Sequence, residues 1–194
     1  MTTATDEAIV EPPSARPWRH SPAFRLLEWV LIIAAAIGTA TLVRTYVAQT
    51  FFIPTASMSP TLRVDDRIAI DKLSYRFRDP RRGEIIVFRG PERTQLAGID
   101  LVKRIVALPG EKVSSVNGRI LVDGTPVDEP YLPKGAAGRN VAFLPFEVPE
   151  GKYFVMGDNR MVSNDSRIFG AIERDEIIGR AMIRIWPISR LGNL

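Results

Sequence analysis

Residues 29–43 carry no charge, and the flanking residues 26–27 and 45–48 bring this apolar segment to the ~20 residues that a membrane-spanning helix needs. A cleaved N-terminal signal sequence is the main alternative, but its apolar stretch is shorter, and Ala48-Gln49-Thr50 makes a poor cleavage site. A helix buried in a soluble core fits less well, because the segment offers too little polar surface. The sequence therefore predicts a retained span over residues 26–48.

The flanks of this segment predict its orientation. Three arginines lie between Glu11 and the segment, whereas no basic residue separates Arg44 from Arg63 on the other side. Because excess positive charge stays in the cytoplasm, we expect a cytoplasmic N-terminus and an exported domain over residues 49–194. Residues 1–25 are polar and contain several prolines, so we expect them to be disordered.

The exported part has the pattern of a mainly β domain. Asn117-Gly118 predicts a hairpin turn between two strands, and residues 130–142 are expected to form an exposed loop. No segment after residue 50 has a clear helical period. The expected strands are short, rich in β-branched residues and bounded by turn residues; they cover residues 67–71, 84–89, 101–108, 112–116, 119–122, 152–156 and 178–186.

Composition excludes several kinds of chemistry. The chain has no cysteine, and its one histidine, His20, precedes the predicted span. A Ser-His-Asp triad and a histidine- or thiolate-bound zinc are therefore not expected, and we predict neither a metal nor another cofactor. The net charge of +4 comes from arginines interspersed with acidic residues. This pattern indicates a solvated surface, so no nucleic-acid partner is expected.

The segment PTASMSPTL, residues 54–62, offers a serine that would need a base. Without histidine or cysteine, a lysine is the best remaining base, and it must be neutral to act. Its ordinary pKa of about 10.4 would have to fall by about 3 units, which burial among apolar residues can achieve. Lys103 is the best candidate, because strand alternation places Leu101 and Ile105 on its face. Two alternatives stay open: Lys72 as the base, and Lys103 as a strand lysine that faces water.

Three segments together resemble a known family. The segments are PTASMSPTL (54–62), VKRIVALPGE (102–111) and GDNRMVSNDSR (157–167), the last followed by GRAMIRIWP (179–187). Their order after an N-terminal span is similar to that of type I signal peptidases, membrane-anchored serine proteases that remove signal peptides from exported proteins. The resemblance extends from residue 26 to the C-terminus. It implies a signal-peptidase-like β domain in a compact form, without a large inserted second domain.

The resemblance implies a Ser/Lys dyad. Ser57 matches the nucleophile that forms an acyl-enzyme, and Lys103 matches the general base. Thr55 matches the residue whose hydroxyl, together with the Ser57 backbone N–H, is expected to form the oxyanion hole. This chain has threonine where serine is common in the family, so the hydroxyl is kept and the added methyl group restricts its rotamer.

The same resemblance implies a supporting loop. Ser163 matches the serine that hydrogen-bonds and orients the lysine, since a neutral buried amine still needs a partner. Asp165 and Arg167 match a pair that holds the loop in place. For Asp158, Asn159 and Arg160, building the turn is a simpler interpretation than direct catalysis.

The expected partners follow from the same family. Signal peptides bind as extended strands and present small residues one and three positions before the cut, so shallow apolar pockets are expected beside the nucleophile. Phe51 and Phe52 suit a domain that lies against membrane lipid. Nothing in the sequence requires more than a monomer. By position, the residues that match the pocket wall, each with core packing as the alternative, are Ile53, Pro54, Met58, Leu62, Leu101 and Val102.

Two other functions use parts of the same pattern. A self-cleaving repressor-type peptidase has a Ser/Lys dyad on a similar β fold, but it is soluble and carries a DNA-binding module, for which there is no helix-turn-helix pattern here. An inactive membrane-tethered scaffold would bind peptides without cutting them. The joint presence of Ser57 and Lys103 speaks against the scaffold.

Overall fold

A computed structural model describes residues 22–46, 48–133 and 142–194. His20, Lys134, most of the expected disordered segment 1–25 and most of the expected loop 130–142 lie outside the described residues. The chain divides into two compact units between Leu42 and Val43.

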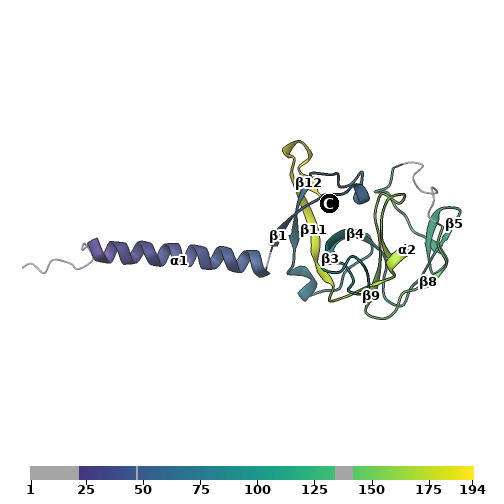
Figure 1. The fold of residues 1–194 in the computed structure, drawn as a ribbon, viewed down its shortest axis with the longest axis horizontal. Coiled ribbons are helices and arrows are strands. Elements are labelled where there is room, and N and C mark those ends of the chain that lie inside the picture. The colour runs from purple at the N-terminus through teal and green to yellow at the C-terminus, as the bar shows by residue number, and fades with distance from the viewer. Residues whose placement is uncertain (1–21, 47, 134–141) are drawn as a thin grey trace, which may run out of the picture. The chain divides into compact units, whose positions relative to one another are not determined.

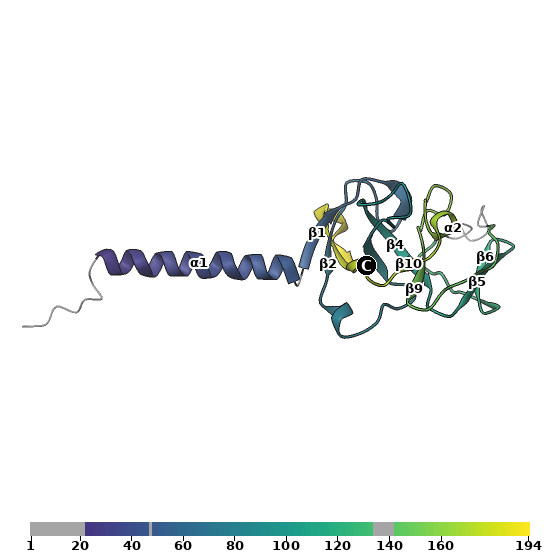
Figure 2. The same cartoon turned by 60° about the horizontal axis from the view of Figure 1, so that its bottom comes forward.

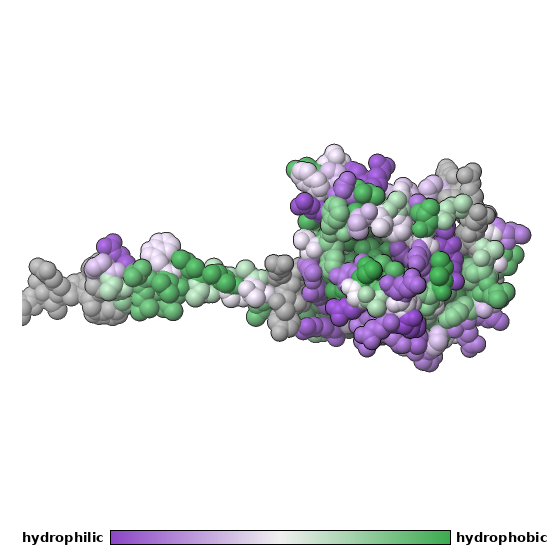
Figure 3. Space-filling view, in the orientation of Figure 1, coloured by the Kyte–Doolittle hydropathy of each residue, from purple (hydrophilic) through white to green (hydrophobic). Residues whose placement is uncertain are grey.

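The first unit is built on α1, a helix over Pro22–Tyr46 (Figure 1). A proline suits the first helical position, because its fixed φ fits the helix and its missing N–H has no partner there. Most of the apolar side chains described for α1, among them Leu26 and Trp29, are exposed. Figure 3 shows hydrophobic residues along most of the visible face of this helix. By length and composition, Pro22–Val43 is able to cross a membrane, a property that a signal sequence would share.

The second unit contains an eight-stranded sheet in which every pairing is antiparallel (Figures 1 and 2). Its strands follow the order β1-β2-β11-β3-β4-β9-β10, and β12 pairs with β11 beside this path. The bounds are β1 Ala48–Phe52, β2 Arg67–Asp71, β3 Ile85–Arg89, β4 Asp100–Ala107, β9 Lys152–Met156, β10 Ile172–Glu173, β11 Ile177–Trp186 and β12 Gly192–Asn193.

A smaller sheet of four strands has the order β7-β6-β5-β8. Asn117 and Gly118 connect β5 to β6, and both have positive φ angles of 48° and 76°. Positive φ at both positions is what a two-residue hairpin turn requires, so the predicted hairpin is confirmed. Figures 1 and 2 both place this sheet at the end of the unit away from β1, near β9 and α2 (Ser166–Phe169). The bounds are β5 Lys112–Val116, β6 Arg119–Val122, β7 Thr125–Pro126 and β8 Phe146–Glu147.

Three clusters of buried side chains form the core. Alternation along β3 separates two of them, because Ile85 and Val87 belong to one cluster while Ile86 and Phe88 belong to another. The third cluster joins the two sheets, since it unites residues of β4 and β9 with Val113 of β5 and with Ile120 and Val122 of β6. The small sheet is thereby fixed to the strand that carries Lys103.

The structure confirms a mainly β fold preceded by one apolar helix. All seven predicted strands are present, with each end within one residue of its predicted position. Among the described residues after residue 50, the only α-helix is α2. The strand β1 was not predicted, because its sequence AQTFF continues the apolar composition of the preceding segment. Four strands of two residues each, β7, β8, β10 and β12, are too short to show a period.

Candidate active site

Ser57 lies in a single 3₁₀ turn, Ala56–Met58, in the segment that follows β1. The turn is held from both sides. Met58 is buried in the core, and its carbonyl accepts a 2.9 Å hydrogen bond from the backbone N–H of Leu62. On the other side, the Ser57 carbonyl accepts a 3.0 Å hydrogen bond from the backbone N–H of Asn159. The segment that carries the serine is therefore joined to the loop of residues 157–165, which we call the β9–α2 loop.

Lys103 Nζ lies 2.7 Å from Ser57 Oγ. Three strands separate β1 from β4 in the sheet, and in a flat sheet four strand spacings would put them roughly 19 Å apart. The contact therefore depends on curvature of the sheet and on the segment after β1, which turns back toward β4. At this distance an ammonium group donates to the serine oxygen, and a neutral amine accepts the serine proton.

The environment of Lys103 favours the neutral amine. The residue is 3% exposed, and its cross-strand partner Ile86 and its neighbour Ile105 are fully buried. Burial, the largest effect, together with the positive charge of Arg167 lowers the pKa of the amine from its usual 10.5 to about 8, against the opposing effect of Asp165 and Asp158. The alternative of a lysine that faces water is therefore wrong.

Lys72 lies elsewhere. It follows Asp71 at the end of β2, and Asp71 pairs with Ala48 at the start of β1. The Ser57 segment leaves from the opposite end of β1, after Phe52. Of the lysines considered from the sequence, the structure brings Lys103 to the serine.

Thr55 immediately precedes the 3₁₀ turn and has an extended backbone. Its Oγ1 donates to Ser57 Oγ at 3.3 Å. The hydroxyl therefore lies beside the atom that would attack, while its expected role in an oxyanion hole stays a prediction.

Ser163 is buried, but its Oγ has no hydrogen-bond partner among the described residues. The expected hydrogen bond to Lys103 is not formed in the structure. The reason is the direction of the hydroxyl: a Cβ added to Gly157 would lie 2.2 Å from Ser163 Oγ and 2.4 Å from the Ser57 carbonyl oxygen. The absence of a side chain at Gly157 thus allows both serines to lie close to it, and the Ser163 hydroxyl faces this glycine.

Asp165 and Arg167 form the pair that the resemblance implied. Arg167 donates from Nε to Asp165 Oδ1 at 2.7 Å and from Nη2 to Oδ2 at 2.8 Å. Asp165 is fully buried, caps the N-terminus of α2 by accepting from the Arg167 N–H, and accepts from the Gly157 N–H at 3.0 Å. One carboxylate therefore joins both ends of the β9–α2 loop.

Arg104 and Asp158 form a buried ion pair that the sequence did not reveal. Arg104 donates to Asp158 from Nε at 2.9 Å and from Nη2 at 2.7 Å. The Thr61 hydroxyl donates to the same carboxylate at 2.6 Å. A hint was present, because an arginine within an apolar strand needs a carboxylate partner, but no pattern identified the partner. Asp158 does more than build a turn, since it connects the β9–α2 loop to the strand of Lys103.

The predicted pocket residues divide by burial. Ile53, Met58 and Leu62 are almost fully buried in one core cluster, so core packing describes them. Pro54 is exposed. Leu101 and Val102 are partly buried and pack against different clusters, which leaves them, with Pro54, as the accessible members of the set.

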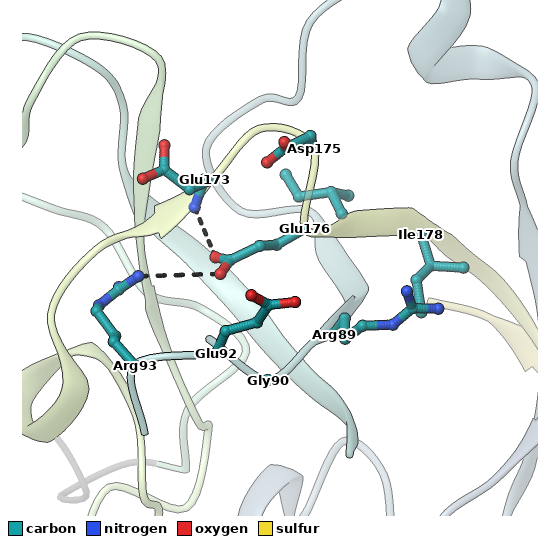
Figure 4. A pocket seen from close by; sticks show the side chains of 9 residues that line it. Arg89, Gly90, Glu92, Arg93, Glu173, Asp175, Glu176 and Ile178 are labelled. Atoms are coloured by element: carbon teal, nitrogen blue, oxygen red, sulfur yellow. Dashed lines mark hydrogen bonds and ion pairs between the residues drawn. The ribbon is translucent and has the colours of Figure 1, made fainter. Parts of the chain in front are cut away.

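A pocket of about 590 Å³ lies away from the dyad, between the end of β3 and the residues around β10 and the start of β11 (Figure 4). The Glu176 carboxylate in this pocket has two partners: Arg93 Nη1 lies 3.9 Å away, and the backbone N–H of Glu173 donates to it at 2.7 Å. Neither Ser57 nor Lys103 lines it. Within the described ranges, no cluster of three or more histidine, cysteine, aspartate or glutamate residues could hold a metal ion.

A buried lysine beside a serine, on a curved antiparallel sheet, is the arrangement that a serine nucleophile with a lysine base would require. The family model described as signal peptidase, peptidase S26, matches residues 26–186. The chain belongs to this family, and the resemblance seen in the sequence is confirmed.

Individual relatives agree with this assignment. Signal peptidase I from Leptolyngbya laminosa is 38% identical over 200 residues, covering 100% of this chain and 97% of that protein. A probable signal peptidase I-2 from Synechocystis sp. is 41% identical, covering 85% of this chain and 73% of the relative. Signal peptidase IB from Staphylococcus aureus is 35% identical, with 84% and 91% covered. A solved signal peptidase I from Enterococcus faecalis V583 is 34% identical, with a TM-score of 0.44 over 53% of this chain and 97% of that one.

Proposed function

We propose that this chain is a membrane-anchored serine endopeptidase that removes signal peptides from exported preproteins, with Ser57 as nucleophile and Lys103 as general base. The observation that carries the proposal is the 2.7 Å separation of Lys103 Nζ from Ser57 Oγ, in a site where burial lowers the pKa of the amine to about 8. The relatives, which are named as signal peptidases I and IB, supply the substrate class.

In the first half-reaction the neutral Lys103 amine takes the Ser57 proton while Oγ attacks the scissile carbonyl carbon. The carbonyl oxygen becomes an oxyanion, which accepts hydrogen bonds from the Thr55 hydroxyl and the Ser57 N–H. The C–N bond then breaks, and the Lys103 ammonium gives its proton to the leaving amine, the new N-terminus of the exported protein. The signal peptide remains on Ser57 as an ester.

In the second half-reaction Lys103, neutral again, takes a proton from a water molecule as the water oxygen attacks the ester carbon. The C–O bond to Ser57 breaks, Lys103 returns the proton to Oγ, and the signal peptide leaves with a free carboxyl group. No step requires a metal or another cofactor.

Three residues support the dyad in this proposal. Ser163 is proposed to turn its hydroxyl toward neutral Lys103 and to become its hydrogen-bond partner, since this buried hydroxyl has no partner among the described residues. Asp165 and Arg167 hold the β9–α2 loop, in agreement with their bidentate pair.

The substrate is proposed to bind as an extended strand beside Ser57, with small residues one and three positions before the cut. Pro54, Leu101 and Val102 would contact these residues directly. The three buried members of the predicted pocket, Ile53, Met58 and Leu62, would form the floor beneath them.

We assign residues 26–48 to a transmembrane anchor, residues 1–25 to the cytoplasm and residues 49–194 to the outer face of the cytoplasmic membrane. The helix α1 has the length and composition for the span. With this topology, the exported residues 49–194 and the apolar segment of a signal peptide reach the same membrane surface. Lipid is then a partner of the anchor. A monomer contains every residue that the mechanism uses.

The test uses the full chain in detergent micelles with a peptide that carries Ala-X-Ala before the expected cut. Mass spectrometry should find cleavage after the second alanine by the wild type and none by Ser57→Ala. Absence of cleavage by the wild type between pH 7 and 10 would reject the proposal in favour of a peptide-binding scaffold. Equal cleavage by Ser57→Ala would remove Ser57 from its role.

A further inference from the structure

Residues 127–133, which follow β7, carry contacts from the small sheet to the β9–α2 loop. The Glu129 carboxylate accepts from Arg160 Nη1 at 3.2 Å and forms a second, shorter contact with Nη2. It also accepts from the Tyr131 hydroxyl at 2.8 Å. The side chains of Arg160 and Glu129 are only 4% and 7% exposed. This is a bidentate pair, which fixes the orientation of the guanidinium as well as its position.

Arg160 transmits this constraint to the active site. Its Nε donates to the Gly157 carbonyl at 3.1 Å. Gly157 lies close to both the dyad serine and Ser163, because an added Cβ would be 2.4 Å from the Ser57 carbonyl oxygen and 2.2 Å from Ser163 Oγ. A chain of contacts therefore runs from Glu129 through Arg160 to the glycine that sets the spacing of the two serines.

A second route starts from the same segment. The Arg104 guanidinium carbon lies 3.8 Å from the centroid of the Tyr131 ring, a cation–π contact. Arg104 is the residue next to Lys103 in β4, and it pairs with Asp158. Both routes thus end on adjacent residues of the β9–α2 loop, and the second also passes through the strand of the base.

Burial makes these contacts sensitive to the loss of one charge. Two arginine–carboxylate pairs are buried, Arg104 with Asp158 and Arg160 with Glu129. Each of the four side chains is at most 8% exposed. Removing one partner of a buried pair leaves a charge without compensation, so the remaining side chain has to move. In an active site, a displacement of about 1 Å can cost on the order of 10²-fold in rate.

We propose that Glu129 is a positioning residue for the dyad, acting through Arg160 on Gly157, and that the small sheet supports catalysis by presenting it. This inference rests on the proposed Ser57/Lys103 mechanism. Glu129 does not touch the substrate in this account, so its loss should lower kcat and leave KM almost unchanged.

The experiment compares Glu129→Gln with Asp128→Asn in the full chain in detergent. Asp128 is the adjacent residue and is exposed. Its replacement by asparagine removes the same negative charge as Glu129→Gln. We expect kcat per folded molecule to fall about 10- to 100-fold for Glu129→Gln, with KM within about twofold of wild type. Asp128→Asn should behave as wild type. The folded fraction is measured by circular dichroism, and Tyr131→Phe, which removes one hydroxyl only, replaces Glu129→Gln if that variant does not fold.

A double-mutant cycle tests the route. If Glu129 acts through Arg160, the double variant Glu129→Gln/Arg160→Gln should be no slower than Arg160→Gln alone. If the loss of kcat in the double variant equalled the product of the losses in the two single variants, Glu129 would not act through Arg160. If folded Glu129→Gln had the kcat of wild type and only a lower Tm, the inference would be overturned. Cleavage by wild type and Asp128→Asn would in that case still support the proposed function. Failure of those two proteins to cleave would reject the proposed function itself.

Discussion

Lys103 and Ser57, 46 residues apart in the sequence, place an amine and a hydroxyl 2.7 Å from each other. The lysine comes from a central strand and the serine from a single turn after an edge strand. The strand supplies burial, which lowers the pKa of the amine, and the turn leaves the serine partly exposed to a substrate.

Lys103→Arg should abolish cleavage, because a guanidinium keeps its proton in a protein and cannot act as a base. Loss of the general base is expected to cost at least about 10²–10⁴-fold in kcat. Lys72→Arg makes the same change just after β2, beside the start of β1 and thus away from the end that leads to Ser57. This variant should retain activity. Peptide cleavage rates of the two variants check this prediction, and the reverse order would move the base to Lys72.

The rate should depend on the protonation of Lys103. Because its pKa is lowered to about 8, the neutral fraction falls about tenfold for each pH unit below 8. We therefore expect kcat/KM to rise with unit slope up to about pH 8 and then level off. The check is a pH–rate profile between pH 6 and 10. An acidic limb with a midpoint near 10.5 would show that the amine is solvated.

Lys103 should make the folded state less stable at neutral pH. Its pKa is lower in the folded chain than in the unfolded chain, so the unfolded state binds more protons between about pH 8 and 10.5. The free energy of unfolding then rises with pH through this window, and the penalty is fully present below pH 8. We expect Lys103→Met to be more stable than wild type at pH 7 by roughly 3 kcal/mol, at about 1.4 kcal/mol per pKa unit.

Thermal unfolding of both proteins at pH 7 and pH 10.5 measures this difference. The gap in Tm should narrow at the higher pH, where the lysine is neutral in the folded state and about half of the unfolded chains have lost the same proton. A gap that does not change with pH would mean that the added stability comes from packing alone.

Much of the fold was predictable, because the β-branched alternation and the Asn117-Gly118 turn are local signals. The dyad was partly predictable, since the absence of other bases left few candidates and apolar neighbours distinguished Lys103. The pairing of Arg104 with Asp158 and of Glu129 with Arg160 was not predictable. These partners lie 54 and 31 residues apart, and only the curvature of the sheet and the docking of the small sheet bring them together.

The direction of the Ser163 hydroxyl was equally beyond the sequence. A motif match implied a hydrogen bond to Lys103, whereas the hydroxyl faces Gly157 and has no partner in the described part of the chain. Rotamers depend on the local backbone and on neighbouring atoms, which a motif does not specify.

Thr55→Val should lower kcat without unfolding the protein. Valine keeps the shape of the threonine side chain but lacks the hydroxyl, which lies 3.3 Å from Ser57 Oγ. Loss of one oxyanion-hole donor typically costs about 10²–10³-fold in kcat. Thr55→Ser, which retains the donor, should stay within about threefold of wild type. Steady-state kinetics of the pair checks the role, and equal rates for the valine and serine variants would exclude it.

Gly157→Ala should remove activity, because the added methyl group would lie 2.2 Å from Ser163 Oγ and 2.4 Å from the Ser57 carbonyl oxygen. Neither approach is tolerated, so the Ser57 turn and the β9–α2 loop must separate and Ser57 Oγ must move away from Lys103. Gly192→Ala is the matched control, since its added Cβ has no neighbour within 4 Å. The two variants are compared by peptide cleavage and by Tm. Wild-type cleavage by Gly157→Ala would show that the spacing of the serines around this glycine does not set the geometry of the dyad.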